Sequence, residues 1–134
     1  MPKITGVHHF AIKLRGEDAF LRAVSFYRDT LGLTEYRRWG EGDQSGAMFR
    51  MGGSVVEMFA NASDAPGAGA LRHIALATDN VDECVKAVRE AGYPILIEPK
   101  DIEIPSVPPV RARIAFCMGP AGEEIEFFDE KKSE

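Results

Sequence analysis

The sequence predicts an α+β fold made of two βαβββ modules, and three observations lead to this prediction. Residues 5–60 read as a strand, a helix and three strands, and residues 71–129 repeat that order. Each half opens with a similar strand, HFAI at residues 9–12 and HIAL at residues 73–76. Each half also closes with a short apolar strand that contains a glutamate. These repeats indicate one structural unit that is used twice.

The elements of the first module follow from periodicity and from turn residues. Gly6–Leu14 alternates between two faces, which is typical of a half-buried strand. A helix is predicted from Asp18, as its N-cap, to Leu31, and Gly32 is expected to end it. Glycine-rich segments then separate three strands. We predict these strands at residues 33–39, 47–51 and 54–60.

The second module repeats these signals. Residues 71–78 alternate like the opening strand of the first module, and a helix is predicted over Val81–Ala91. Asp79 or Asn80 would cap this helix, and Gly92 would end it. The remaining strands are predicted at residues 93–98, 111–118 and 123–128.

One segment, Lys100–Val110, breaks the symmetry between the modules. It is longer than its counterpart and contains Pro105, Pro108 and Pro109. Proline has no backbone N–H group, so it is excluded from the interior of a sheet. We therefore expect a stiffened loop here, placed over a binding site.

The length of 134 residues predicts a single domain with a substantial core. Within this domain, module 1 would cover about residues 5–60 and module 2 about residues 71–129. Residues 61–70 are rich in glycine, proline and small side chains and are expected to form a linker. Residues 130–134 are expected to form a charged tail.

The composition excludes several classes of function. A net charge of −5, with acidic and basic residues interspersed, argues against a nucleic-acid or anionic-membrane partner. No apolar run is long enough to span a bilayer, and the first residues lack the apolar core of a signal peptide. We therefore expect a cytoplasmic protein that acts on a small molecule. In that reducing compartment, Cys84 and Cys117 are expected to be free thiols.

Four side chains at matched positions of the two modules are the candidates for chemistry. His9 and Glu57 belong to the first module, and His73 and Glu126 belong to the second. Two imidazoles and two carboxylates suit a divalent metal that keeps open positions for water. A single strand histidine is commonly a structural residue, whereas a buried, unpaired glutamate is costly to desolvate. Four such residues in matched positions favour the metal site.

Strand alternation predicts which residues share a face with these candidates. The bulky apolar residues fall on the opposite face, where they are expected to pack under the helices. Small neighbours such as Ala11 and Ala75 would leave room for a ligand. Arg113 and Cys117 are expected on the ligand face. A set of aromatic residues is expected in the core: Phe20, Phe26, Tyr27 and Trp39.

Several stretches resemble the vicinal oxygen chelate superfamily, which includes glyoxalase I, acyl-CoA epimerases, extradiol dioxygenases and antibiotic resistance proteins. The matching stretches are VHHFAI at 7–12, FYRDTLGL at 26–33, VEM at 56–58, RHIAL at 72–76 with DNV at 79–81, and GPAGEEIEF at 119–127. The resemblance implies paired βαβββ modules that form an open, barrel-like mixed sheet with helices outside. It also implies a homodimer.

The resemblance further implies that His9, Glu57, His73 and Glu126 bind one divalent ion per site, with nickel, cobalt or zinc expected. This ligand set is that of bacterial glyoxalase I, in which glutamates also act as catalytic bases. Asn61 matches an asparagine that contacts glutathione in that family. Lys13 stands where those enzymes usually carry an arginine that binds glutathione.

The expected function is that of a glyoxalase I-type lyase or isomerase, acting by proton abstraction and enediolate stabilisation on a 2-oxoaldehyde–thiol adduct. Glu126 or Glu57 would be the base. Lys13, Asn61 and Arg113 are candidates to hold an anionic part of the substrate, although each could equally be a solvated or structural residue. The alternatives are an epimerase of acyl-CoA or sugar substrates, a ring-cleaving dioxygenase, and a metal-free antibiotic-binding protein.

Overall fold

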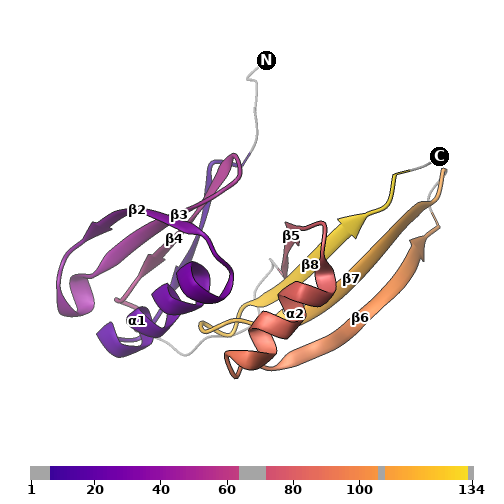
Figure 1. Cartoon of the computed structure of the whole chain (residues 1–134). Helices are drawn as coiled ribbons and strands as arrows, with labels where there is room; N and C mark the ends of the chain where they lie inside the picture. Colours follow the sequence, from indigo (N-terminus) through magenta and orange to yellow (C-terminus); the bar gives the residue numbers. More distant parts are fainter. Residues whose placement is uncertain (1–6, 64–71, 106–107, 133–134) are drawn as a thin grey trace, which may run out of the picture. The chain divides into compact units, whose positions relative to one another are not determined.

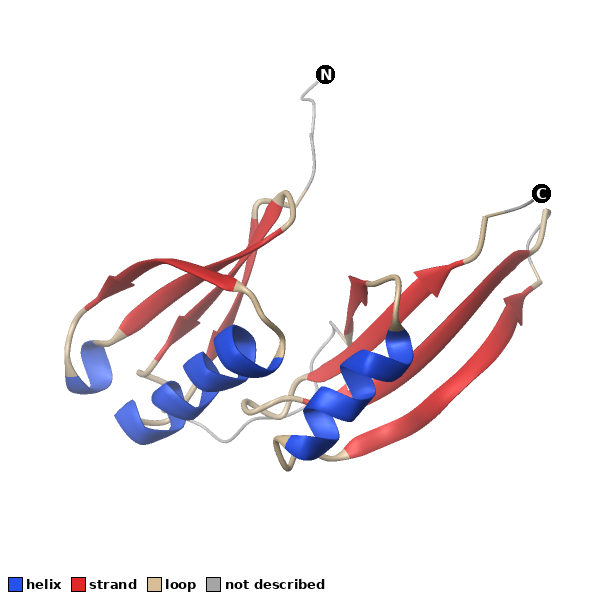
Figure 2. Ribbon diagram, viewed as in Figure 1, coloured by secondary structure: helices blue, strands red, loops and turns tan. Residues whose placement is uncertain are grey.

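The computed structural model describes residues 7–63, 72–105 and 108–132 and divides the chain into two compact units, Met1–Pro66 and Gly67–Glu134. Each unit contains a four-stranded mixed sheet and one α-helix (Figures 1 and 2). The predicted α+β fold with two βαβββ modules is therefore confirmed. No helix in the described part of the chain has both the length and the apolar character needed to cross a membrane.

In the first unit, β1 at one edge runs parallel to β4, and the other neighbours are antiparallel. The order of the strands in the sheet is β1-β4-β3-β2. The strands are β1 (His9–Lys13), β2 (Thr34–Trp39), β3 (Gly46–Met51) and β4 (Ser54–Phe59). A short 3₁₀ turn, η2 (Gly42–Gln44), connects β2 to β3. β2, β3 and β4 lie within one residue of their predicted positions at each end, whereas β1 begins at His9, three residues after the predicted start.

The helical segment of this unit consists of α1 (Glu17–Ser25) and a π-helical continuation, η1 (Phe26–Thr30). The predicted N-cap was wrong: Gly16, with a φ of 89°, precedes the helix, and Asp18 lies in the first turn. The negative charge of Asp18 in the first turn still stabilises the helix, because it lies near the positive end of the helix dipole. Gly32 ends the helix as predicted, because its φ of 75° is readily adopted only by glycine.

The core of the first unit lies between its helical segment and one face of the sheet. Phe20 and Val24 from α1 are buried, as are Phe26 and Tyr27 from η1. The sheet contributes alternate residues of its strands, which are also buried: Ile12, Ala47, Phe49, Val56 and Met58. The period-two pattern therefore leaves the other face of the sheet, which carries His9 and Glu57, for chemistry.

The second unit has the same topology, with β5 parallel to β8 and the order β5-β8-β7-β6. The elements are β5 (Ile74–Ala77), α2 (Val81–Glu90), β6 (Ile95–Ile104), β7 (Val110–Met118) and β8 (Glu124–Glu130). As one of the two predicted caps, Asn80 accepts a hydrogen bond from the backbone N–H of Glu83 at 3.0 Å. The helix packs on β6, β7 and β8 (Figure 1).

The prediction of a loop at Lys100–Val110 is wrong for the first part of this segment. β6 continues to Ile104, and its residues from Lys100 onwards pair with β7. Because β6 is the edge strand, its prolines do not interrupt a ladder on both sides. Pro99 lies at a register shift between Ile97 and Lys100, and Pro105 follows the last residue of the strand.

The predicted faces of β7 were also wrong. Phe116 pairs with Glu126, so Phe116 shares the face of the candidate glutamate. Cys117 pairs with Ile125 and is fully buried on the helix side. Both faces of this strand carry apolar residues, and alternation alone therefore could not decide which face packs under the helix.

Candidate functional site

Each unit brings one histidine close to one glutamate. In the first unit, Nε2 of His9 lies 3.6 Å from Oε1 of Glu57. In the second unit, Nε2 of His73 lies 3.3 Å from Oε1 of Glu126. Both imidazole side chains are 42% exposed, whereas the carboxylate side chains are 13% and 11% exposed. Each pair therefore has an accessible nitrogen beside a largely buried carboxylate.

The two pairs arise from the same strand register. Ala11 of β1 is the partner of Glu57 in β4, and Ala75 of β5 is the partner of Glu126 in β8. Each histidine precedes that alanine by two residues, so it lies on the same face and reaches the glutamate diagonally. The small alanine between them leaves space for the imidazole. The duplicated sequence thus produces the same donor geometry twice.

The surroundings of the two imidazoles differ. Nδ1 of His9 lies 2.9 Å from Nδ1 of His8, so one of these rings donates a hydrogen bond to the other. This contact occupies Nδ1 of His9 and leaves Nε2 on the side of Glu57. His73 instead packs edge-on against Phe116, with ring centroids 5.2 Å apart. Arg72 takes the sequence position before His73 that His8 takes before His9.

Burial raises the pKa of the Glu126 carboxyl above its ordinary value, and the neighbouring His73 opposes this shift in part. The cause is desolvation, which disfavours the charged form of a carboxylic acid. A carboxylate whose pKa moves towards neutrality is a better proton acceptor at neutral pH than an ordinary surface glutamate. Glu126 is therefore a candidate for a general base.

The raised pKa also predicts how the metal-free protein responds to pH. Because folding favours the protonated form, the contribution of Glu126 to stability is complete below the unfolded pKa and is lost as pH rises through the folded pKa. Metal-free Glu126→Gln should therefore unfold at a higher temperature than the wild type near neutral pH, with a smaller difference in acid. Thermal unfolding at both pH values checks this. Glu124→Gln, which removes an exposed charge from the same strand, is the control.

A difference between wild type and Glu126→Gln that is the same in acid and at neutral pH would contradict this prediction. It would show that the variant acts through packing and that ionisation of Glu126 has no part in the effect.

Two of the predicted substrate-binding residues lie at the ends of strands in the first unit. Lys13 is the last residue of β1, is exposed, and has Phe59 as its strand partner. Asn61 follows β4, is exposed, and forms an isolated backbone bridge with Arg15. Alternation places Lys13 on the face that carries His9.

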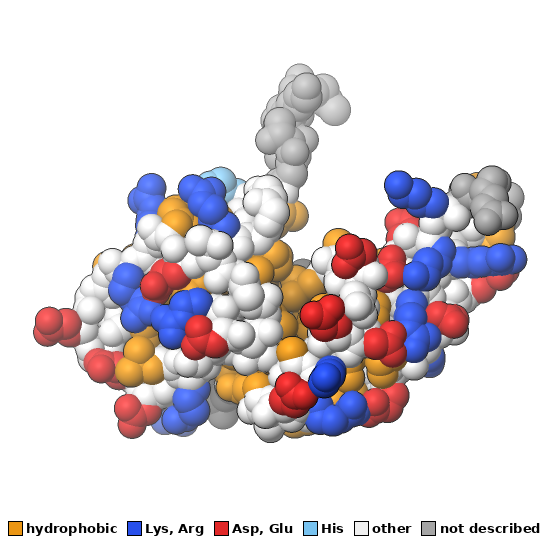
Figure 3. Space-filling model, viewed as in Figure 1, with side chains coloured by type: hydrophobic (Ala, Val, Ile, Leu, Met, Phe, Trp, Pro, Cys, Tyr) orange, Lys and Arg blue, Asp and Glu red, His pale blue; other side chains and the backbone are white. Residues whose placement is uncertain are grey.

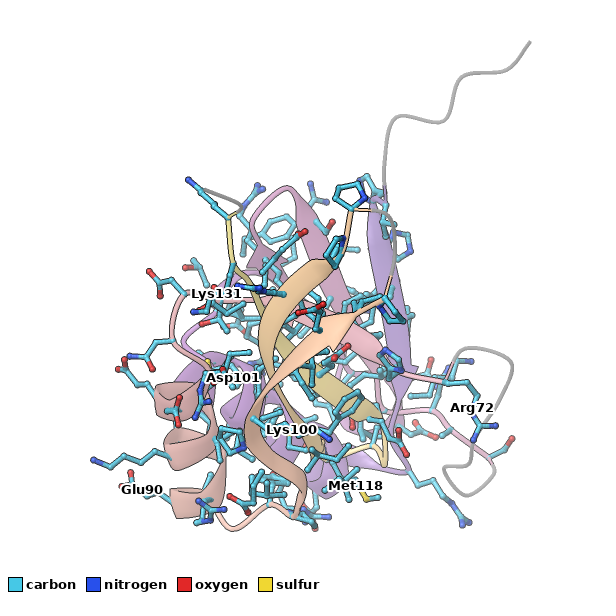
Figure 4. The ribbon with its side chains drawn as sticks, turned by 90° about the vertical axis from the view of Figure 1, so that its right-hand side faces the viewer. Arg72, Glu90, Lys100, Asp101, Met118 and Lys131 are labelled. Carbon is cyan, nitrogen blue, oxygen red and sulfur yellow. The ribbon has the colours of Figure 1, made fainter. Side chains whose placement is uncertain are left out.

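Arg113 lies elsewhere. Its guanidinium donates hydrogen bonds to Asp82 of α2 at 2.7 and 2.9 Å, and to Asp101 of β6 at 3.2 Å. Both carboxylates raise the pKa of Arg113, and Arg113 lowers the pKa of Asp82. Figure 4 labels Asp101 on β6. Arg113 thus fastens the start of α2 to the sheet on the face opposite to Glu126.

The described residues contain no group of three or more histidine, cysteine, aspartate or glutamate side chains that could hold a metal. The candidate ligands occur as two pairs, one in each unit. On the face of each unit that Figure 3 shows, acidic and basic side chains are interspersed.

The sequence reasoning missed one residue on the open face of the first sheet. Trp39, predicted in the core, is 37% exposed, whereas Phe20, Phe26 and Tyr27 are buried as predicted. Its indole packs against Phe59, with ring centroids 6.0 Å apart. The available signal was its position at the end of a strand before a glycine-rich turn, where core residues are uncommon.

The fold and the site together define a duplicated βαβββ protein with a histidine–glutamate pair in each module. The family model of the Glyoxalase/Bleomycin resistance protein/Dioxygenase superfamily matches residues 6–127. The chain belongs to this superfamily. No curated protein matches it.

Solved structures of low sequence identity share the fold. An antibiotic-binding protein from Streptomyces sp. CB03234 has a TM-score of 0.72 at 21% identity, covering 98% of this chain and 100% of its own. A lactoylglutathione lyase from Agrobacterium tumefaciens has a TM-score of 0.66 at 20% identity, with 95% of each chain covered. A fosfomycin resistance protein from Listeria monocytogenes has a TM-score of 0.69 at 15% identity, with 96% of each covered. These neighbours have different functions, so the likeness establishes the fold alone.

Proposed function

We propose that the chain is a metal-dependent lyase or isomerase of the glyoxalase I type. Its cation ligands are His9, Glu57, His73 and Glu126. The observation that carries the proposal is the histidine–glutamate pair that appears in the same register in both units. The proposal includes a homodimer and leaves open whether the ligands of one cation come from one chain or from two.

The side chains fit such an ion. Imidazole nitrogen and carboxylate oxygen are the donors that nickel, cobalt and zinc accept in proteins. Glu57 and Glu126 are largely buried, and their nearest positive partners are histidines that are charged only when protonated. A divalent cation would offset the cost of holding these carboxylates away from water.

When bound, the cation would supply Lewis-acid stabilisation of the negative charge that develops on the substrate oxygens. The side chains move the proton. In the adduct of a 2-oxoaldehyde with a thiol, the hydroxyl-bearing carbon lies beside a carbonyl carbon. One glutamate removes the proton from the first carbon, and a glutamate returns a proton to the second. The hydroxyl proton of the first carbon passes to the oxygen of the second, so that the first becomes the thioester carbonyl and the adduct is converted into a 2-hydroxy thioester. Glu126 is the stronger candidate for the first step, because burial raises its pKa.

Lys13 and Asn61 are our candidates for holding an anionic part of the substrate, since both are exposed near the ends of the strands that carry His9 and Glu57. Arg113 is left out of the proposed site, because its guanidinium is bonded to Asp82 and Asp101.

The test is metal analysis of the purified protein together with an assay of methylglyoxal and thiol. We expect one nickel, cobalt or zinc ion per chain, thioester formation that stops after treatment with a chelator, and recovery when the ion is returned. Turnover that persists without a metal, or none with any of the three ions, would overturn the proposal.

A second candidate is a binding protein without catalysis, which the exposed Trp39 beside Phe59 favours. Such a protein would bind its ligand with no metal and produce no thioester.

An epimerase would use the same two glutamates, so metal analysis does not separate it from the proposed lyase, but assays with acyl-CoA and sugar substrates do.

A further inference from the structure

Four residues form one row across the open face of the first sheet. Lys13 pairs with Phe59, Phe59 with Gly46, and Gly46 with Trp39. Glu57 lies two residues before Phe59 on the same strand and therefore on the same face. Two residues of a strand span about 7 Å. The row that contains Trp39 therefore lies next to Glu57 on this face of the sheet.

The space needed by the Trp39 indole explains why a glycine stands at position 46. The backbone conformation of Gly46 does not itself require glycine. Gly46 is absent from the glycines with a positive φ, so its backbone would accept any residue. Ile114 occupies the corresponding position of the second unit, opposite Phe128. A Cβ atom on Gly46 would overlap Cε2, Cζ2 and Nε1 of the Trp39 indole. The missing side chain therefore lets the indole lie across β3 towards Phe59.

The indole keeps an accessible surface in this position. Trp39 is 37% exposed and meets Phe59 at an interplanar angle of 65°, an edge-to-face contact. In the second unit, the corresponding row carries Lys100 in place of tryptophan, opposite Ile114. The aromatic pair is thus a departure from the repeat, and the common fold does not require it.

Lys13 supplies a positive charge at the other end of the row. Its side chain is exposed, and no ion pair of Lys13 occurs among the residues that the structure describes. Neighbouring strands lie about 5 Å apart. An anion bound at Lys13 would consequently place an attached ring over Phe59 and Trp39.

We infer that Trp39 and Phe59 form a specificity-determining wall for substrates in which a planar aromatic group is joined to an anionic or oxygen-rich end. This inference rests on the proposed function and narrows its substrate class to aryl-substituted 2-oxoaldehyde–thiol adducts and their aryl 2-hydroxy thioester products, of which aryl 2-hydroxy acids are analogues. Trp39 and Phe59 contact the ring, and Lys13 pairs with the anion.

Mandelate and lactate test this inference, because they share a 2-hydroxy acid and differ by a phenyl group in place of a methyl group. The chain has one tryptophan, so the emission of Trp39 reports a ring that binds beside it. We expect mandelate to change this emission and to bind about tenfold more tightly than lactate, as edge-to-face and stacked aromatic contacts allow. Equal affinities, or no binding of mandelate, would overturn the inference.

Variants separate the contributions of the aromatic wall and of Lys13 to binding. Binding to Trp39→Ala, which has no tryptophan emission, is measured by calorimetry. Trp39→Ala should bring the two affinities close together, and Gly46→Ala should do so while keeping the indole but moving it. Lys13→Gln should lower the affinities for mandelate and lactate by a similar factor and preserve the ratio of the two affinities. Leu21→Ala, which removes an exposed apolar side chain from α1, is the control and should change nothing. An unchanged ratio in both Trp39→Ala and Gly46→Ala would contradict the inference.

The measurement is made before and after metal removal, so that the two proposals fail separately. Both acids offer the same oxygens to a cation, and the ratio of their affinities therefore isolates the ring. A protein that prefers mandelate but binds no metal would refute the metalloenzyme and leave the aromatic wall in place. A metal-dependent lyase with equal affinities would refute the wall alone.

Discussion

Glu126→Gln is expected to lower kcat for the thiol adduct of methylglyoxal by about 10²–10⁴-fold, the range that a positioned general base contributes. Glutamine has the shape of glutamate and keeps a carbonyl oxygen that can act as a ligand, but it cannot accept a proton at neutral pH. Turnover should therefore be lost while the cation stays bound. Steady-state kinetics and metal analysis of the same preparation check both parts.

The matched control is Glu124→Gln. Glu124 lies two residues earlier on β8, on the same face, but is exposed, whereas Glu126 is buried. The control should keep both turnover and metal. If Glu126→Gln turns over normally with its metal bound, Glu126 is not the essential base, and Glu57→Gln should then show the loss. If neither variant loses activity, proton transfer by these glutamates is wrong.

This expectation depends on burial more than on the identity of the residue. Glu126 and Glu124 are both strand glutamates, but Glu124 is exposed, whereas Glu126 is buried and this burial raises its pKa. The neighbouring β7 contributes to this environment, because Phe116 lies opposite Glu126 and packs against His73. An apolar neighbour favours the neutral acid, and the histidine favours the carboxylate.

The sequence was sufficient to predict the repeat and the two histidine–glutamate pairs. Period-two alternation placed His9 and Glu57 on the face opposite Ile12 and Val56, and the burial of these residues agrees. In the second unit, the same pattern placed Glu126 on the face opposite Ile125 and Phe127, which are also buried. Alternation is clearest in β1, where one face carries Phe10 and Ile12 and the other carries His9, Ala11 and Lys13.

The features that the sequence could not predict depend on strand register. β7 has apolar residues on both faces, so the side of Cys117 became clear only from its pairing with Ile125. The prolines at the end of β6 suggested a loop, because nothing in the sequence shows that β6 is an edge strand. The position of the Trp39 side chain depends on Gly46, its partner on the neighbouring strand. The alternation of residues along one strand does not reveal which residue of another strand lies beside it.

The strongest expected effect on metal binding comes from the histidines taken together. If one cation is shared, His9→Ala and His73→Ala should each remove it, and the double variant should be no worse than either single one. Changes in residues that only orient metal ligands already cost about 10–100-fold in affinity, so loss of a ligand should cost at least that much. Titration with nickel, cobalt and zinc, followed by metal analysis, measures both the affinity and the stoichiometry.

Two independent sites would behave differently. If each histidine–glutamate pair held its own ion, each single variant would keep half of the metal and the losses would add in the double variant, as they do for sites that do not interact. Non-additive loss is therefore the signature of a shared cation. The close match of the two pairs, with nitrogen–oxygen distances of 3.6 and 3.3 Å, makes the single variants comparable. Half-retention would replace the four-ligand site with two weak ones, each of which would leave a cation more open to water.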